Sequence, residues 1–296
     1  MTLPWDLHFH IGPEVIGRRF DALQAAESLR DDGMAGLVMK NHYFSTVPFA
    51  QMAQSRGYEG VWGSLTMNHY TGGLNPFALR GSLGMKNPAG QTLLKMVWMP
   101  TVHAASHLAV RKAHGALYDI PPEWTGGVLA GTPIGQVPPI SVTAPEVQSP
   151  LKEILRIIAG EGLILATGHI SREEVFFLVP LAADMGVEKI VLTHPMYETT
   201  GLSIDDIRQL TSLKGVYAEQ SYALIPIDGK DPSAIAQYIR GVGAERTLLS
   251  TDLGQAKRQT AGEGMRLFCD LLKAEGIPAA DLDRMCCDNP RTLLGL

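Results

Sequence analysis

The chain has 296 residues, of which 45% are hydrophobic and 19% charged, with a formal net charge of −5. This composition is typical of a globular protein with a sizeable core, and the length suits one barrel of about 250 residues or two small domains. The acidic balance argues against non-specific nucleic-acid binding, which needs a basic surface. The chain opens without a basic, apolar leader and contains no apolar run long enough to cross a membrane.

Cysteine is sparse, with Cys269 and the adjacent pair Cys286 and Cys287. Three thiols cannot form a disulfide framework, so we expect a reducing compartment, the cytoplasm. The adjacent pair lies in a helical pattern beside Leu282 and Met285. We therefore expect these two thiols to pack in the core rather than to serve redox or metal chemistry.

Short apolar runs alternate along the chain with segments that have apolar residues at helical spacing. One helical segment ends before Gly33 and another before Gly186, where glycine commonly stops a helix. Eight strands separated by helices predict parallel βαβ units, and hence an α/β fold of the (β/α)8 TIM-barrel type. The alternative, an open doubly wound sheet, lacks a glycine-rich turn after the first strand. The expected strands are Trp5–His10, Gly36–His42, Gly60–Asn68, Leu93–Thr101, Leu163–His169, Lys189–Pro195, Gly215–Tyr222 and Thr247–Leu253.

A long insert between the fourth and fifth strands, from about residue 103 to 150, interrupts this rhythm. Its Gly- and Pro-rich stretches, such as 120–122 and 126–139, cannot form regular helix, although 127–129 and 140–142 could pair as a hairpin. A loop that follows a barrel strand lies on the C-terminal face, so we expect a substrate lid or an oligomer contact. We expect residues 1–296 to form one barrel domain that carries this insert.

The first strand reads Asp6-Leu7-His8-Phe9-His10. Because side chains alternate along a strand, Asp6, His8 and His10 share one face. Two imidazoles at the carboxyl end of a strand can bind one cation from the same side, which predicts that His8 and His10 are metal ligands. Asp6, one step deeper, is expected to support them or to fill the barrel floor.

Three later strands end in ionisable residues: His169 on the fifth, His194 on the sixth and Asp252 on the eighth. Barrel enzymes keep their catalytic residues at these strand ends. Each residue alone could cap or brace the structure. Convergence of four strands on one mouth is instead typical of a metal-dependent active site.

The set of His8, His10, His169, His194 and Asp252 resembles the amidohydrolase superfamily of metal-dependent (β/α)8-barrel hydrolases. The closing Asn289-Pro290 before a short apolar run is also similar to the last helix of that superfamily. The resemblance spans nearly the whole chain. A metal-dependent phosphoesterase barrel also begins with His-x-His, but it usually has more early metal ligands than this chain offers.

The resemblance implies that His8, His10 and Asp252 bind a divalent metal, with His169, His194 or both completing the shell. Asp252 would also accept the proton of the attacking water, and His194 would remain for catalysis in a one-metal site. Two-metal members usually have a bridging lysine or glutamate after the fourth strand, whereas Lys95, the lysine there, lies too early to reach the mouth. One metal is the arrangement that fits best. We expect Zn, with Mn, Fe, Co or Ni as alternatives.

Several further residues compete for roles near the mouth. Lys40 and His42 share one face of the second strand, and an outward lysine would be pressed into the helical layer, so Lys40 should face inward. It could bind a substrate carboxylate, stabilise an oxyanion or, if carboxylated, bridge two metals. We expect His42, His103, Glu198 and Glu219 to contact substrate, with Glu219 alternatively orienting a metal-bound histidine. His103 and His107 also have the spacing of one helical face.

Three functions remain open at this point. The first is hydrolysis of an amide, cyclic amide or lactone of a small molecule by metal-activated water. The second is a metal-dependent lyase, such as a decarboxylase, on the same barrel, with Lys40 holding the carboxylate that leaves. The third is a non-catalytic barrel. Phosphate-ester hydrolysis is a weaker variant of the first, because no arginine cluster or glycine-rich cradle stands beside a strand end. We expect a small-molecule partner and possibly a homo-oligomer.

Overall fold

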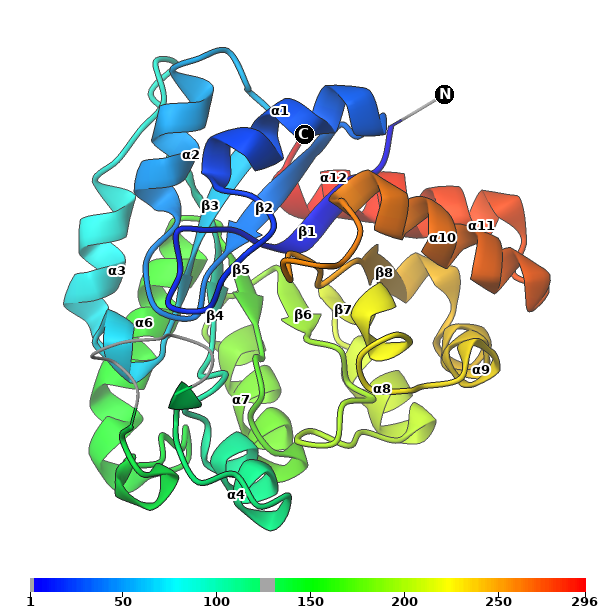
Figure 1. Ribbon diagram of the computed structural model, residues 1–296. Coiled ribbons are helices and arrows are strands. Elements are labelled where there is room, and N and C mark those ends of the chain that lie inside the picture. Colours follow the sequence, from blue (N-terminus) through cyan, green and yellow to red (C-terminus); the bar gives the residue numbers. More distant parts are fainter. Residues whose placement is uncertain (1–2, 123–130) are drawn as a thin grey trace.

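The computed structural model describes residues 3–122 and 131–296. Its strands form one sheet in chain order with every adjacent pair parallel, and a parallel bridge between Phe9 and Leu253 joins the first strand to the last (Figure 1). The predicted (β/α)8 barrel is confirmed, and the doubly wound alternative is wrong. The strands are β1 (Trp5–His10), β2 (Gly36–Lys40), β3 (Val61–Thr66), β4 (Leu94–Trp98), β5 (Ile164–Ala166), β6 (Ile190–Leu192), β7 (Val216–Ser221) and β8 (Thr247–Ser250).

Helices surround the strands (Figure 1). Four of them, α1, α7, α8 and α10, begin with a capping box, in which the side chain of the N-cap residue and that of the third helical residue satisfy each other's backbone N–H groups. The helices of the described chain are α1 (Ala22–Asp32), α2 (Val47–Gln54), α3 (Pro76–Leu83), α4 (Ala105–Ala113), α6 (Gln148–Gly160), α7 (Arg172–Asp184), α8 (Ile204–Thr211), α9 (Pro232–Val242), α10 (Ala261–Ala274), α11 (Ala279–Asp283) and α12 (Asn289–Leu294).

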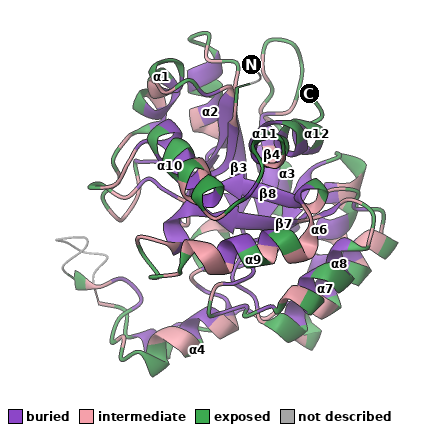
Figure 2. Cartoon of the chain, turned by 90° about the vertical axis from the view of Figure 1, so that its right-hand side faces the viewer, coloured by how far each residue is buried: buried purple, intermediate pink, exposed green. Residues whose placement is uncertain are grey.

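The strands form the interior of the molecule, and Figure 2 shows them buried while the outer helical surfaces are exposed. Six of the eight strands are buried at every position, as expected for parallel strands covered on both faces. The predicted stop of α1 is confirmed, since Gly33 caps it in the left-handed conformation. Cys286 and Cys287 are buried in an apolar cluster, as expected for packing.

The insert contains helix α4, which begins only two residues after His103. His103 therefore lies outside the helix, and the helical spacing that would have placed it on one face with His107 does not apply. The expected hairpin is not found in the described chain: residues 127–129 lie outside the described part, and Ile140 makes a single parallel bridge with Ala104. Among the described helices, none has the length and apolar character needed to cross a bilayer.

Candidate metal centre and active site

A cavity of about 400 Å³ opens where the strands end and where the insert folds over them. The cavity lies at the C-terminal face of the barrel, where an active site was predicted. Its lining combines residues at the ends of strands with residues of the insert. The lining side chains that carry polar or ionisable groups are His10, Arg18, Lys40, His42, Tyr43, His107, Arg111, Asp119, His169, His194, Tyr197, Asp228, Asp252 and Gln255.

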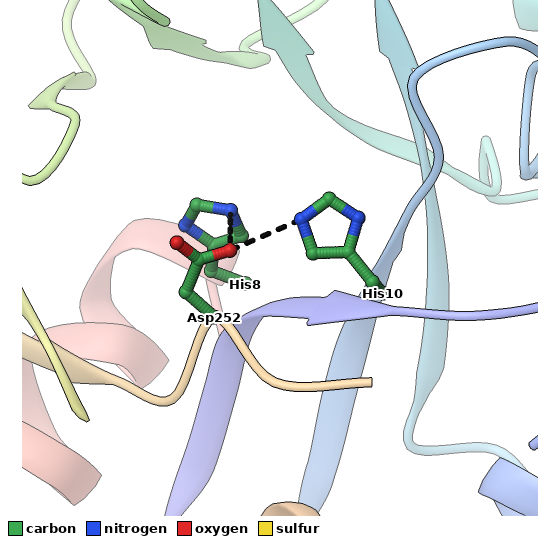
Figure 3. A group of neighbouring side chains, drawn as sticks. All are labelled: His8, His10 and Asp252. Atoms are coloured by element: carbon green, nitrogen blue, oxygen red, sulfur yellow. Dashed lines mark hydrogen bonds and ion pairs between the residues drawn. The ribbon is translucent and has the colours of Figure 1, made fainter. Parts of the chain in front are cut away.

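Three of the predicted ligands converge at one point on the seam between β1 and β8 (Figure 3). The Nε2 atom of His8 lies 2.9 Å from Oδ1 of Asp252, and Nε2 of His10 lies 3.0 Å from the same oxygen. Metal–ligand bonds of about 2.0–2.2 Å at a tetrahedral centre separate ligand atoms by about 3.3 Å. The two imidazoles and the carboxylate therefore offer ligand atoms of the kind that zinc prefers, at separations close to those of a zinc site. Together they would cover one side of the ion.

His8 is held in the tautomer that a metal ligand requires. Its Nδ1 lies 3.1 Å from Glu219, which is also buried, so Nδ1–H donates to this carboxylate and Nε2 carries a lone pair. In this tautomer Nε2 and Oδ1 of Asp252 are two acceptors 2.9 Å apart, an arrangement that a cation or a proton between them stabilises. Burial opposes protonation of His8, but the Asp252 charge outweighs it and raises the pKa of the imidazole. The site attracts positive charge.

His10 is bordered on its other side by a buried ion pair that sequence reasoning missed. Nη2 of Arg18 lies 3.2 Å from Nδ1 of His10, and Arg18 is itself paired with Glu14. Burial, and then the charge of Arg18, hold the pKa of His10 well below its usual value. The available signal was the i, i+4 pair of opposite charges in the loop after the first strand, since that loop lies at the mouth.

Asp252 and His194 are the only non-glycine residues of the described chain with positive φ, at 53° and 22°. Such strain concentrates at functional sites. Oδ2 of Asp252 lies 4.0 Å from Nε2 of His194, whose other ring nitrogen is buried and has no hydrogen-bond partner among the described residues. Burial raises the pKa of Asp252, but the positive charge of His8 when its ring is protonated, and the hydrogen bonds that His10 and protonated His8 donate, lower it well below its ordinary value. Burial also lowers the pKa of His194 to about 4, so its ring is neutral at pH 7.

Asp6 supports this corner from beneath. Its carboxylate accepts from the backbone N–H of His8 at 3.0 Å and from that of Thr251 at 3.1 Å, and it also bonds the Thr251 hydroxyl. Burial raises the pKa of Asp6 to about 6. Asp6 thus ties β1 to the end of β8 and fixes the residue just before Asp252.

His169 lies in the cavity wall but outside the group of three. Its ring centre is 5.0 Å from that of His194, and its Nδ1 lies 3.0 Å from Nδ1 of His107 on α4. The residue before it, Gly168, has φ of 65°, and a Cβ there would meet the carbonyl oxygen of Met99 at 2.4 Å. This close approach between β5 and β4 sets the position of His169. The sequence paired His107 by spacing with His103, whereas the structure pairs it with a residue 62 positions away.

Lys40 faces inward, as the strand pattern predicts. It is 1% exposed, its Nζ lies 2.7 Å from Nε2 of His8, and it stands 4.1 Å from the ring centre of Trp98. Burial lowers the pKa of Lys40 to about 8. His42 also lines the cavity, where its ring packs 4.7 Å from that of His10 and its Nδ1 bonds Thr101 at 2.9 Å.

The remaining predicted substrate contacts do not line the cavity. Glu219 lies beneath His8 and also accepts from the backbone N–H of His194 at 3.1 Å, which is the orienting position that its alternative role required. His103 bonds the cavity residue Asp119 at 3.2 Å and so stands behind the wall. Glu198 is 57% exposed and pairs with His114 on a neighbouring surface hollow.

Comparison with known proteins places the chain among barrels of this type. A family model described as a family of unknown function, DUF6282, matches residues 4–219. Among the curated proteins, none matches the sequence.

Solved structures with the same fold include three hydrolases. N-acetyl-D-glucosamine-6-phosphate deacetylase from Mycobacterium smegmatis is 17% identical with a TM-score of 0.59, over 99% of this chain and 76% of that one. Organophosphorus hydrolase from Deinococcus radiodurans is 14% identical with a TM-score of 0.60, over 100% and 93%. A zinc-bound amidohydrolase from Burkholderia multivorans is 12% identical with a TM-score of 0.53, over 100% of both chains. These similarities establish the fold that the sequence resemblance implied.

Proposed function

The chain belongs to DUF6282, a family of unknown function, and we propose that it is a metal-dependent hydrolase acting on an amide, cyclic amide or lactone of a small molecule. The observation that carries this proposal is the convergence of Nε2 of His8, Nε2 of His10 and Oδ1 of Asp252 at one cavity wall. Three barrel neighbours are named as a deacetylase, an organophosphorus hydrolase and a zinc-bound amidohydrolase, which agrees with this choice.

His8, His10 and Asp252 would hold one metal ion, which we expect to be zinc, with His169 or His194 as a further ligand. Such an ion lowers the pKa of a bound water from about 15.7 towards 7 and polarises a carbonyl oxygen. The second carboxylate oxygen of Asp252 lies near His194 in the cavity. Asp252 stays ionised, so it can accept the proton of the water. His194, neutral and next to that oxygen, is placed to pass the proton to the leaving group.

The first test is the metal content of the purified protein, measured by elemental mass spectrometry. About one transition metal per chain supports a one-metal hydrolase and justifies a screen of amides and lactones. About two would assign the cavity histidines, including His107, to a second ion. No metal after zinc or manganese is added to stripped protein would contradict the proposal.

Turnover separates the hydrolase from the lyase on the same barrel. A hydrolase incorporates ¹⁸O from labelled water into the product, whereas a decarboxylase releases CO₂ without incorporation. The buried Lys40 beside the ligands is the feature that would serve a decarboxylase, because it could hold the departing carboxylate. Asp252→Asn should remove turnover in either enzyme; full activity of this variant would move the general base to His194.

A further inference from the structure

We propose that Lys40 and Arg18 form a carboxylate-binding subsite beside the metal ligands, so that the substrate is a small molecule bearing a carboxylate in addition to the bond that is cleaved. This inference rests on the proposed hydrolase function and names its substrate class. It follows from the surroundings of these two cations, which the metal site alone does not explain.

Lys40 is a buried cation that makes no direct contact with a carboxylate of the described residues. Its Nζ touches one imidazole nitrogen of His8 and the ring of Trp98, and no carboxylate of the described residues forms an ion pair with it. A buried ammonium is costly unless an anion accompanies it, and an aromatic face replaces only part of that anion. Because Lys40 lines the cavity, a ligand can supply the missing charge.

Arg18 adds a planar donor to the same wall. Its Nε is engaged by Glu14, its Nη2 faces Nδ1 of His10, and its Nη1 has no partner among the described residues. Ligation of a metal through Nε2 of His10 leaves the proton of that ring on Nδ1, and a guanidinium, which only donates, then loses its acceptor there. Both Nη groups of Arg18 are in that case available to an anion.

The other polar groups of the cavity favour a single carboxylate. Arg111 already donates to the carbonyls of Asp119 and Tyr118, both at 2.8 Å, so it is committed to the insert. Lys40 and Arg18 line the same cavity, and an ammonium and a guanidinium are the donors that bind carboxylate oxygens. The cavity of about 400 Å³ limits the ligand to a small molecule.

A matched pair of probes tests the subsite on zinc-loaded protein. Glutarate and its monoamide each offer one carboxylate to the metal and differ only in the second group, and their affinities are measured by isothermal titration calorimetry. We expect wild type to prefer glutarate by roughly 10- to 100-fold, the effect of one or two charge-assisted hydrogen bonds. Lys40→Met should reduce this preference to below about 3-fold, and Arg18→Gln should reduce it in part.

The control variant is Lys95→Met. Lys95 is also a barrel lysine stacked on a tryptophan, 4.4 Å from the ring centre of Trp62, but it lies outside the cavity, so this variant should keep the full preference. Zinc content measured on every sample separates failure of the proposed hydrolase function from failure of the proposed carboxylate subsite. Failure of wild type to bind zinc would count against the hydrolase, and the preference for glutarate over its monoamide, then measured on the metal-free protein, would still report on the subsite.

Two results would overturn the inference. One is equal affinity of wild type for glutarate and its monoamide, or an unchanged preference in both folded variants, Lys40→Met and Arg18→Gln. The other is a ¹³C carbamate resonance in protein equilibrated with ¹³C-bicarbonate that disappears in Lys40→Met, because Lys40 would then carry its own anion.

Discussion

At the scale of single residues, Glu219 decides how well the site can hold a metal. Its carboxylate accepts both the Nδ1–H of His8 and the backbone N–H of His194, and it is 1% exposed. Glu219→Gln keeps the size but places a donor where an acceptor is needed. We expect metal affinity to fall about 10- to 100-fold, as for other carboxylates that orient a ligating histidine.

Competition with a chelating dye measures that change in affinity. Glu198→Gln is the matched control, because Glu198 is an exposed carboxylate outside the cavity, and its affinity should equal that of wild type. A dissociation constant unchanged in Glu219→Gln would mean that His8 does not ligate through Nε2.

The side-chain positions that the sequence indicated correctly are those that follow from period-2 alternation. His8 and His10 share a face because they are two residues apart, and Lys40 faces inward for the same reason. The missed contacts are those made by loops. Arg18 reaches His10 from an irregular segment, and His107 reaches His169 from the insert, so neither contact is encoded in a local spacing.

At the scale of elements, the capping boxes stabilise the starts of four helices. Asp206 offers the clearest test of this stabilisation. Its carboxylate closes the capping box of α8 and pairs with Arg172 of α7 at 2.6 Å. The hydrogen bond from Arg172, opposed by burial and aided by Ser203, lowers the pKa of Asp206 below its ordinary 3.8. Its stabilisation is therefore complete above about pH 4 and is lost as the pH falls through the lowered folded pKa.

Asp206→Asn should consequently lower the Tm at pH 7 by about 2 to 4 °C, the effect of a capping interaction of about 1 kcal/mol in a chain of this length. The difference between variant and wild type should shrink as the pH falls below 4, and thermal denaturation followed by circular dichroism measures it. Asp205→Asn, at an exposed neighbouring position, serves as the control. A difference that grows towards low pH would reverse the assigned sign.

Elements were predicted better than their ends. All eight strands were expected where they occur, because each is a short segment rich in apolar residues, but β5 and β6 extend over only three residues each. The predicted ranges of these two strands included His169 and His194, which instead follow the strands in irregular backbone. The positive φ of His194 illustrates the reason: strain at a site is imposed by tertiary packing, which local propensity does not report.

At the scale of the whole molecule, the candidate metal centre lies on the seam that closes the barrel. β1 and β8 meet through one bridge and two backbone hydrogen bonds, from His10 to Leu253 at 2.7 Å and from Asp252 to His8 at 2.8 Å. The three candidate ligands come from both sides of this seam. A metal bound there would link the first strand to the last, so it should stabilise the entire fold rather than only the cavity.

Removing the metal should therefore lower the Tm. At a free metal concentration of 100 Kd, binding to the folded state alone contributes about 2.7 kcal/mol, which corresponds to roughly 5 to 10 °C for a chain of this size. Scanning calorimetry of chelator-stripped and zinc-reloaded protein measures this shift. In the variant His8→Ala with His10→Ala, zinc should leave the Tm unchanged, because both imidazole ligands are gone. An equal gain in wild type and variant would place the stabilising ion elsewhere, and the seam would close without it.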